Sequence, residues 1–175
     1  MTDLIVLCKN RYPSVHDLGV LFSKFTLENF DKVILVVRNS FKGGVLAAEF
    51  KNKYQDSKFK VLPYSTDDKG MIEAIAMHTF APVANYFIID STIIPKEVIS
   101  LPCENTVFHT KEGISLYYLK DITLPWDYSK DVWLRYGEGT MVSRKHMGGF
   151  DDMINRLEPK GITFNRVYLE TVGVV

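Results

Sequence analysis

The sequence predicts an α/β fold with a mostly parallel central sheet and flanking helices, in a single compact domain. Short apolar, β-branched runs alternate three times with segments of helical spacing in the first half of the chain. This alternation calls for a parallel sheet with right-handed crossover connections. The chain has 175 residues, of which 46% are hydrophobic and 13% aromatic. That composition and length suffice for one packed core.

Four strands are predicted in the first half, at residues 4–8, 32–37, 58–62 and 86–90, because each is a short apolar run. Helices are predicted between them. The first carries an apolar stripe from Val15 to Phe25, with Ser14 and Asp17 placed as a capping pair. The other two span residues 45–54 and 71–80.

A different arrangement is predicted for the second half of the chain. There, a hairpin around Gly113 joins residues 106–110 to residues 114–119. A proline-bounded loop at residues 124–130 follows. A short strand at residues 140–143, a helix starting near Lys145 or later, and a final strand at residues 162–169 complete the prediction. No linker, internal repeat or low-complexity tract separates the halves, so we expect them to share one sheet.

The charge balance argues against attraction to nucleic acid or membranes by overall charge, and the cysteines argue against a metal site or a disulfide framework. Twenty-one basic residues balance twenty-one acidic ones, so no overall field attracts nucleic acid or anionic membranes. We expect no signal peptide and no membrane span, and therefore a cytoplasmic protein. Cys8 and Cys103 match neither a metal-ligand spacing nor a disulfide framework. Both are expected to be reduced thiols in the core.

Ligands of open α/β sheets bind beyond the carboxyl ends of the strands, and every predicted strand tip in the first half is polar. Arg11 offers a planar fork suited to phosphate, and Asn10 offers a donor and an acceptor suited to a base or ribose. Asp67 and Asp68 follow the third strand. They either contact the ligand or cap the next helix.

Asp90 ends the most apolar strand and precedes an Ile-Ile-Pro run. An aspartate at this position emerges from the core into the predicted cleft. It could ligate Mg²⁺ or Mn²⁺ or accept a hydrogen bond from a ribose hydroxyl. The alternative is that Asp90 caps a turn at residues 94–96, Ile-Pro-Lys.

Three segments resemble one known family. They are LIVLCKNRYP at residues 4–13, YFIIDSTIIP at residues 86–95 and GTMVSRKHMGGFDD at residues 139–152. Their order and content are similar to those of GT-A type nucleotide-sugar glycosyltransferases. The third segment is the most specific, because it combines a strand, a Ser-Arg turn and a Gly-Gly-Phe-Asp sequence.

The resemblance implies a nucleotide-diphosphate sugar as donor, with its base near Asn10 and Arg11 and its diphosphate near Asp90. A divalent cation, Mn²⁺ or Mg²⁺, is implied as a possible cofactor, with Asp90 as its ligand. Residues 1–100 would form the nucleotide-binding half of one GT-A-like domain spanning residues 1–175. Residues 101–175 would form the acceptor-side half.

The resemblance also implies that Gly148, Gly149 and Phe150 shape the pocket for the sugar and the acceptor. Paired glycines let backbone amides approach a ligand closely, and a phenylalanine ring gives an apolar face on which a sugar can stack. The alternative is a helix start with close packing. Asp151 or Asp152 could take the proton of the acceptor hydroxyl as a general base.

The chain departs from the family pattern in two places. Thr92 stands where a second aspartate of the metal motif is usual, and a hydroxyl is a poor cation ligand. Either Asp90 and the diphosphate hold the metal alone, or basic side chains offset the leaving-group charge; the candidates are Arg11, Lys69, Arg144 and Lys145. An acidic segment that commonly follows Gly-Gly-Phe-Asp is also missing, so Asp151, Asp152 or Glu158 would have to replace it.

Three functions follow from the sequence. The first is a glycosyltransferase of reduced size, whose acceptor could be a small molecule, a glycan, a protein or a modified nucleic-acid base. The second is a non-catalytic module that binds nucleotide sugars or a partner. The third is a nucleotidyltransferase, although these enzymes usually carry a glycine-rich loop after the first strand, and residues 8–13 contain no glycine.

Overall fold

The computed structural model describes residues 2–9, 11–64, 84–123, 132–136, 140–143, 154–155 and 158–174. The first half contains β1 (Thr2–Cys8), α1 (Val15–Phe22), a 3-10 turn η1 (Leu27–Asn29), β2 (Lys32–Arg38), α2 (Phe41–Lys53), β3 (Phe59–Tyr64), β4 (Ala84–Asp90) and β5 (Ile93–Pro95). The second half contains β6 (Thr106–His109), β7 (Leu116–Thr123), β8 (Val132–Tyr136), β9 (Thr140–Ser143), η2 (Glu158–Lys160), β10 (Asn165–Tyr168) and β11 (Thr171–Val174).

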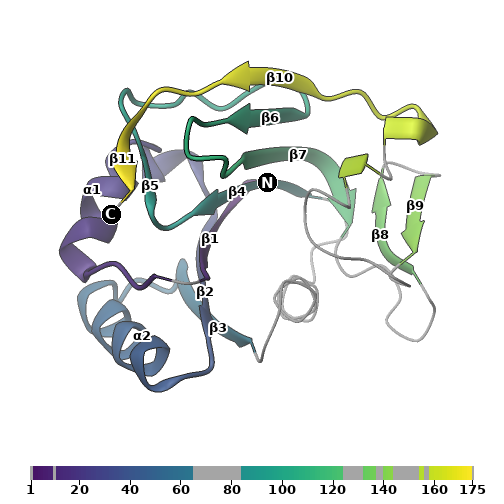
Figure 1. Ribbon diagram of the computed structural model, residues 1–175. Helices are drawn as coiled ribbons and strands as arrows, with labels where there is room; N and C mark the ends of the chain where they lie inside the picture. The colour runs from purple at the N-terminus through teal and green to yellow at the C-terminus, as the bar shows by residue number, and fades with distance from the viewer. Residues whose placement is uncertain are drawn as a thin grey trace.

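The central sheet has the strand order β10-β6-β7-β4-β1-β2-β3, and β8 and β9 continue from β7 (Figure 1). The strands β3, β2, β1 and β4 are parallel to their neighbours. The strand β7 runs antiparallel to both β4 and β6, while β10 is parallel to β6. Only β7 is therefore reversed along the seven-strand path, as expected for a mostly parallel α/β sheet that includes both halves of the chain.

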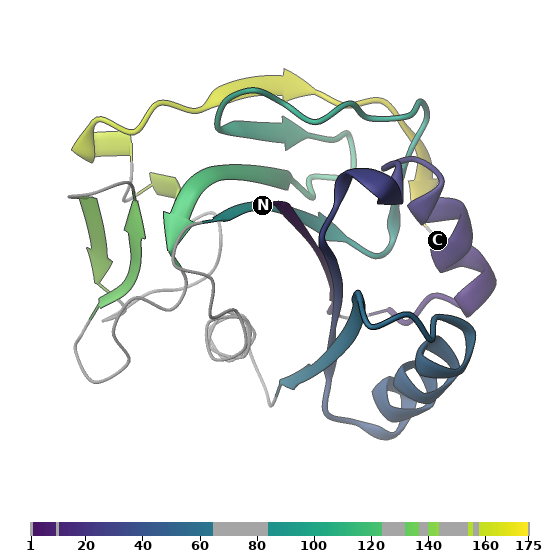
Figure 2. The same ribbon diagram turned by 180° about the vertical axis from the view of Figure 1, so that it is seen from behind.

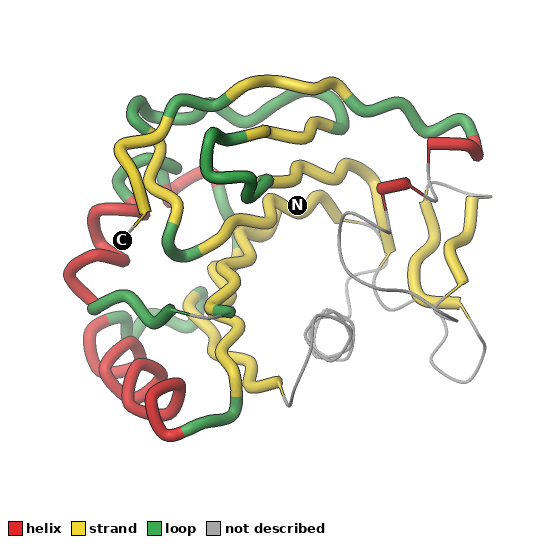
Figure 3. The backbone as a smooth tube through the Cα atoms, viewed as in Figure 1, coloured by secondary structure: helices red, strands yellow, loops and turns green. Residues whose placement is uncertain are grey.

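The helices α1 and α2 contact each other and lie beside β1 and β2 (Figure 3). The capping prediction at the start of α1 is confirmed, since the Ser14 hydroxyl accepts a hydrogen bond from the Asp17 amide at 3.1 Å. Leu18, Leu21 and Phe22 of α1 are buried, and they pack into one core with residues of β1, β2, β4 and α2. The two helices therefore bury a face of the parallel half of the sheet.

Several predicted boundaries change in the structure. The helix α2 begins at Phe41 rather than at residue 45, because Ser40 caps it and accepts from the Gly43 amide at 3.1 Å. The predicted strand at residues 162–169 is shorter in the structure, where it forms β10. The strands β5, β8 and β11 were not predicted. The predicted hairpin around Gly113 is confirmed by the antiparallel pairing of β6 and β7. The predicted third helix lies outside the described residues.

The strands β5 and β11 form a separate two-stranded antiparallel sheet, in which Thr171 is registered with Pro95 and Val174 with Ile93. Figures 1 and 2 show this pair next to α1. The C-terminal strand β11 thus returns to the segment that follows β4. Within the described part of the chain, no helix is long and apolar enough to cross a membrane.

Candidate functional site

The strand order reverses at β1, because β2 and β3 lie on one side of β1 and β4 lies on the other. In an open α/β sheet this reversal creates a crevice at the carboxyl ends of the two diverging strands. Leu7 is registered with Asp90, and the Ser91 amide donates to the Leu7 carbonyl at 2.9 Å. The candidate site is therefore the carboxyl edge of β1 and β4, as the sequence predicts.

Asp90 stands at this edge with its side chain almost fully buried, at 8% exposure. One carboxylate oxygen, Oδ1, accepts two hydrogen bonds from Thr92, from the amide at 2.9 Å and from the hydroxyl at 2.5 Å. Two donors on one oxygen hold the carboxylate in a single orientation. Asp90 thus caps the turn at Thr92, whereas the alternative that the sequence left open was a cap for the turn at residues 94–96, where the structure has β5. The second carboxylate oxygen makes no bond to Thr92.

Cys8 ends β1 next to this carboxylate and is fully buried. Burial raises the pKa of the Cys8 thiol to about 12, a hydrogen bond with Ser91 opposes this rise, and the charge of Asp90 adds to it. A thiol with so high a pKa is not a nucleophile at neutral pH. Cys103, in contrast, is exposed, so the prediction that both cysteines lie in the core is wrong for Cys103.

The loops after β1 and β2 meet at the same edge of the sheet. The hydroxyl groups of Tyr12 and Ser40 are 3.2 Å apart and share a hydrogen bond. Ser40 also caps α2, so the first amides of this helix lie at the carboxyl edge, where helix N-termini favour anions. Phe41, the first residue of α2, is 86% exposed. Arg11 is exposed in the loop before Tyr12.

A contact that the sequence analysis did not predict joins the β6–β7 turn to the C-terminal strand. The Thr171 hydroxyl donates to Glu112 Oε1 at 2.7 Å, and this hydrogen bond is the main cause that lowers the pKa of the Glu112 carboxyl. Since β11 pairs with β5, and β5 follows Asp90 directly, the contact anchors the segment beyond Asp90. No local sequence pattern could have revealed a contact across 59 positions.

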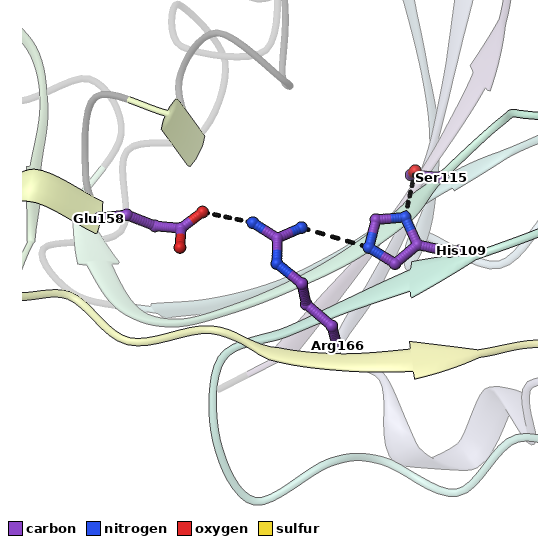
Figure 4. Close-up of polar contacts among 4 residues, drawn as sticks. All are labelled: His109, Ser115, Glu158 and Arg166. Atoms are coloured by element: carbon purple, nitrogen blue, oxygen red, sulfur yellow. Dashed lines mark hydrogen bonds and ion pairs between the residues drawn. The ribbon is translucent and has the colours of Figure 1, made fainter.

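A second polar cluster lies across β6 and β10 (Figure 4). Arg166 Nη1 contacts His109 Nε2 at 3.2 Å, and Arg166 Nη2 pairs with Glu158. A guanidinium has only donors, so His109 Nε2 accepts and the neutral ring carries its proton on Nδ1. That nitrogen faces the Ser115 hydroxyl at 3.4 Å. A protonated Nδ1 cannot take the serine proton, so this cluster is structural and not a nucleophile with its base.

Of the predicted site residues, the structure places Arg11 and Asp90 at the carboxyl edge. The other predicted positions lie outside the described residues and stay predictions; they are Asn10, Asp67, Asp68, Gly148, Gly149, Phe150, Asp151 and Asp152. Tyr12 is an addition that the tertiary structure makes. Ser40 and Thr92 lie at strand tips that the sequence also indicated, and the structure gives them their roles as a helix cap and as a donor to Asp90. The Ser40 cap could have been found from the sequence, because a serine before a glycine-containing helical segment is a common N-cap.

A divalent cation at this site has one described candidate ligand, Asp90. Among the residues that the structure describes, no group of three or more histidine, cysteine or acidic side chains could hold a metal ion. A single carboxylate nevertheless fits Mg²⁺ or Mn²⁺ in a nucleotide site, because these ions are held by one or two carboxylates together with substrate phosphates. The hard oxygen of Asp90 is the type of donor that such an ion prefers.

Comparisons with known proteins show the fold. No protein-family model matches the chain, and no curated protein matches its sequence. Among solved structures, 4-diphosphocytidyl-2C-methyl-D-erythritol synthase from Anaerococcus prevotii is similar with a TM-score of 0.53 and 11% identity. The likeness covers 97% of this chain and 87% of that enzyme. Rv0371c from Mycobacterium tuberculosis, solved alone and with manganese, has a TM-score of 0.49, 11% identity and coverage of 97% and 88%.

The likeness to the Anaerococcus prevotii synthase extends over almost the whole chain, so it includes both the parallel half and the reversed strand β7. At 11% identity it shows the shared fold alone. The chain therefore shares the fold of this synthase, a mostly parallel sheet with flanking helices in one domain.

Proposed function

We propose that this protein is a transferase that binds a nucleotide-diphosphate sugar at the carboxyl ends of β1 and β4 and transfers the sugar to an acceptor hydroxyl. The observation that carries the proposal is the position of Asp90. Its buried carboxylate lies at the point where the strand order reverses, and Thr92 holds it in one orientation. A rigid carboxylate at a switch point supports the binding of a cation and a diphosphate or of a ribose.

In the proposed reaction the acceptor oxygen forms a bond to the anomeric carbon, and the bond from that carbon to the diphosphate breaks. The nucleoside diphosphate leaves with the bonding electron pair. The acceptor proton passes to a carboxylate, for which Asp151 and Asp152 are the candidates from the sequence. A divalent cation bound at Asp90 would offset the negative charge that develops on the diphosphate.

Nucleotidyl transfer is the second candidate. The fold that this chain shares with a synthase of a diphosphocytidyl compound supports it. In that reaction an acceptor phosphate oxygen would attack the α-phosphorus of a nucleoside triphosphate and release pyrophosphate. The loop after β1 argues against it, because residues 8–13 contain no glycine and glycine lets a loop approach a triphosphate closely.

The decisive experiment is a thermal-stability titration with nucleotide sugars, nucleoside triphosphates and free nucleotides, each with and without Mn²⁺. A ligand that binds only the native state raises the unfolding midpoint. We expect a shift with one nucleotide-diphosphate sugar and its loss in Asp90→Asn. Asp56→Asn is the matched control, because Asp56 accepts from the Lys58 amide at the opposite edge of the sheet.

The products of turnover separate the candidate functions. Release of a nucleoside diphosphate from the sugar donor supports glycosyl transfer, and release of pyrophosphate from a triphosphate supports nucleotidyl transfer. Binding of a nucleotide sugar without release of either product would support the non-catalytic binding module instead. Absence of a shift across the whole panel would contradict the proposed site at Asp90.

A further inference from the structure

The helix α2 carries apolar residues on two opposite faces. Leu46 and Phe50 of its inner face are buried in the core that the helix shares with β1 and β2. A helix on the surface of a globular protein usually has charged and polar residues on the face opposite the core. The outer face of α2 does not follow this rule.

Four apolar or small residues form a stripe along this outer face. They stand at helix positions i, i+3, i+4 and i+7, which lie on one side of a helix, and all four are exposed; they are Phe41, Gly44, Val45 and Ala48. Phe41 is 86% exposed and Val45 is 44% exposed. In both ribbon views α2 lies at the periphery of the molecule (Figures 1 and 2). We call these four residues the outer stripe.

Lysines border the outer stripe. The exposed charged residues of α2 are three lysines and one glutamate, namely Lys42, Lys51, Lys53 and Glu49. With 3.6 residues per turn, Lys42 and Lys51 fall on opposite sides of the stripe. The ammonium group of Lys53 lies over the Tyr54 ring, 5.5 Å from its centroid. This excess of positive charge is local, because basic and acidic residues balance over the whole chain.

We propose that the outer stripe docks on the surface of an anionic lipid bilayer. An exposed aromatic ring in an apolar stripe with lysines beside it is the arrangement by which helices lie in a membrane interface. Lysine stems extend along apolar surface while their ammonium groups reach the polar headgroups. Anionic headgroups attract such lysines, so the charge at α2 and the charge of the bilayer are complementary.

The same charges argue against a second copy of this chain as the partner. An antiparallel pairing of two outer stripes would bring Lys42 of one copy toward Lys51 of the other. A parallel pairing would bring each lysine toward its own counterpart. Like charges that meet across an interface are unfavourable. Phe41 also protrudes, and a protein partner would need a matching pocket for it, whereas a bilayer accepts a ring without one.

The docking surface adjoins the candidate site. Phe41 begins α2, and Ser40, which precedes it, shares a hydrogen bond with Tyr12 in the loop after β1. A protein held by the outer stripe therefore keeps the carboxyl edge of the sheet beside the bilayer. The docking goes beyond the proposed function and does not depend on it, so its test and the nucleotide titration can fail separately.

The first test is cosedimentation of the full chain with vesicles of phosphatidylcholine, alone or with added phosphatidylserine. We expect binding to the vesicles that contain phosphatidylserine. Phe41→Ser should weaken this binding about tenfold, because it removes one large apolar side chain from the interface. Tyr168→Ser removes an exposed aromatic ring from β10 and should keep the binding. No binding to either kind of vesicle, or equal losses in the two variants, would overturn the proposal.

The second test changes the charge beside the outer stripe. The double variant Lys42→Glu, Lys51→Glu should lose the preference for phosphatidylserine. Lys111→Glu, Lys120→Glu makes the same change of net charge at two exposed positions of the β6–β7 hairpin and should keep it. Added salt should weaken the binding of the unchanged chain, because it screens exposed charges. Equal losses in the two double variants would make overall charge the cause and overturn the proposal.

The third test locates the contact and does not require the charge variants to fold. In a Cys103→Ser background, an environment-sensitive fluorophore is attached at Ala48→Cys, within the outer stripe, or at Tyr168→Cys on β10. The buried Cys8 is not labelled. On addition of phosphatidylserine vesicles, we expect a blue shift of the emission at position 48 and none at position 168. No shift at position 48, or equal shifts at both positions, would refute the docking of α2.

Discussion

Thr92 occupies the position where a second metal-binding aspartate is usual in the family that the sequence resembles, and its hydroxyl donates to Asp90 instead. The residue therefore positions a carboxylate rather than supplying one. A short loop between β4 and β5 makes this contact possible, since the two residues are two positions apart.

Replacement of Thr92 by valine removes the hydroxyl donor and leaves the shape nearly unchanged. We expect the free energy of unfolding to fall by about 1.5–3 kcal/mol, the usual contribution of a hydrogen bond to a charged group. We also expect a smaller Mn²⁺-dependent shift of the unfolding midpoint with nucleotide. Thr106→Val is the control, because it removes a buried hydroxyl that donates to the Glu104 carbonyl. An unchanged Mn²⁺-dependent shift in Thr92→Val would contradict the positioning role.

The two cysteines provide a second prediction at the residue scale. With a pKa of about 12, the Cys8 thiol stays protonated at neutral pH, and its burial also blocks reagents. Alkylation of the native protein near neutral pH should therefore modify Cys103 and spare Cys8, as measured by mass spectrometry. In denaturant both should react. Rapid labelling of Cys8 in the native state would mean that the end of β1 opens readily.

At the scale of the elements, the turn from β2 into α2 depends on Gly43. A Cβ atom at this position would lie 2.1 Å from the Arg38 carbonyl oxygen and 3.2 Å from the Ser40 hydroxyl. The first of these is a backbone atom, which cannot move aside as the end of a flexible side chain can. The amide of Gly43 also completes the Ser40 cap. The start of α2, and hence the carboxyl edge near Ser40, is therefore tied to a residue without a side chain.

Gly43→Ala should lower the free energy of unfolding by about 1–3 kcal/mol, the usual cost of an added methyl group in a packed site. Gly44→Ala is a close control, because nothing lies within 4 Å of its Cβ position. That substitution should stabilise the helix by roughly 0.5–1 kcal/mol. Urea unfolding of the two variants measures both effects. Equal stabilities would show that the β2–α2 turn adjusts without cost.

At the scale of the whole molecule, stability should depend on one buried acid. Asp3 is 1% exposed at the start of β1. Burial raises the pKa of the Asp3 carboxyl, and the charge of Lys32 opposes that rise. Between the pKa of Asp3 in the unfolded state and its raised pKa in the folded state, the folded protein keeps the Asp3 proton that the unfolded chain has released. Stability is therefore highest below the pKa of the unfolded acid and falls as the pH rises through the raised pKa.

The variant Asp3→Asn should remove this part of the pH dependence. We expect the stability of Asp3→Asn relative to the wild type to increase as the pH rises from about 4 to about 7. Urea unfolding at several pH values measures the difference. Asp17→Asn, in the first turn of α1, serves as control. A relative stability that stays constant with pH would show that Asp3 is ionised at no cost in the folded protein.

The sequence by itself determined the features that depend on local periodicity. The apolar runs of β1, β2, β3 and β4 and the stripe and cap of α1 were predictable because neighbouring residues specify them. The same runs located the carboxyl edge, and with it Asp90. The roles of residues 148–152 in the sugar and acceptor pocket stay a prediction from the family resemblance.

Only tertiary structure decided the features that depend on distant pairing. The order of the strands, the return of β11 to β5 and the contact of Glu112 with Thr171 join positions that no local pattern links. The reason is physical: periodicity specifies which face of an element is buried, whereas the choice of neighbour is made by packing among elements far apart in the chain.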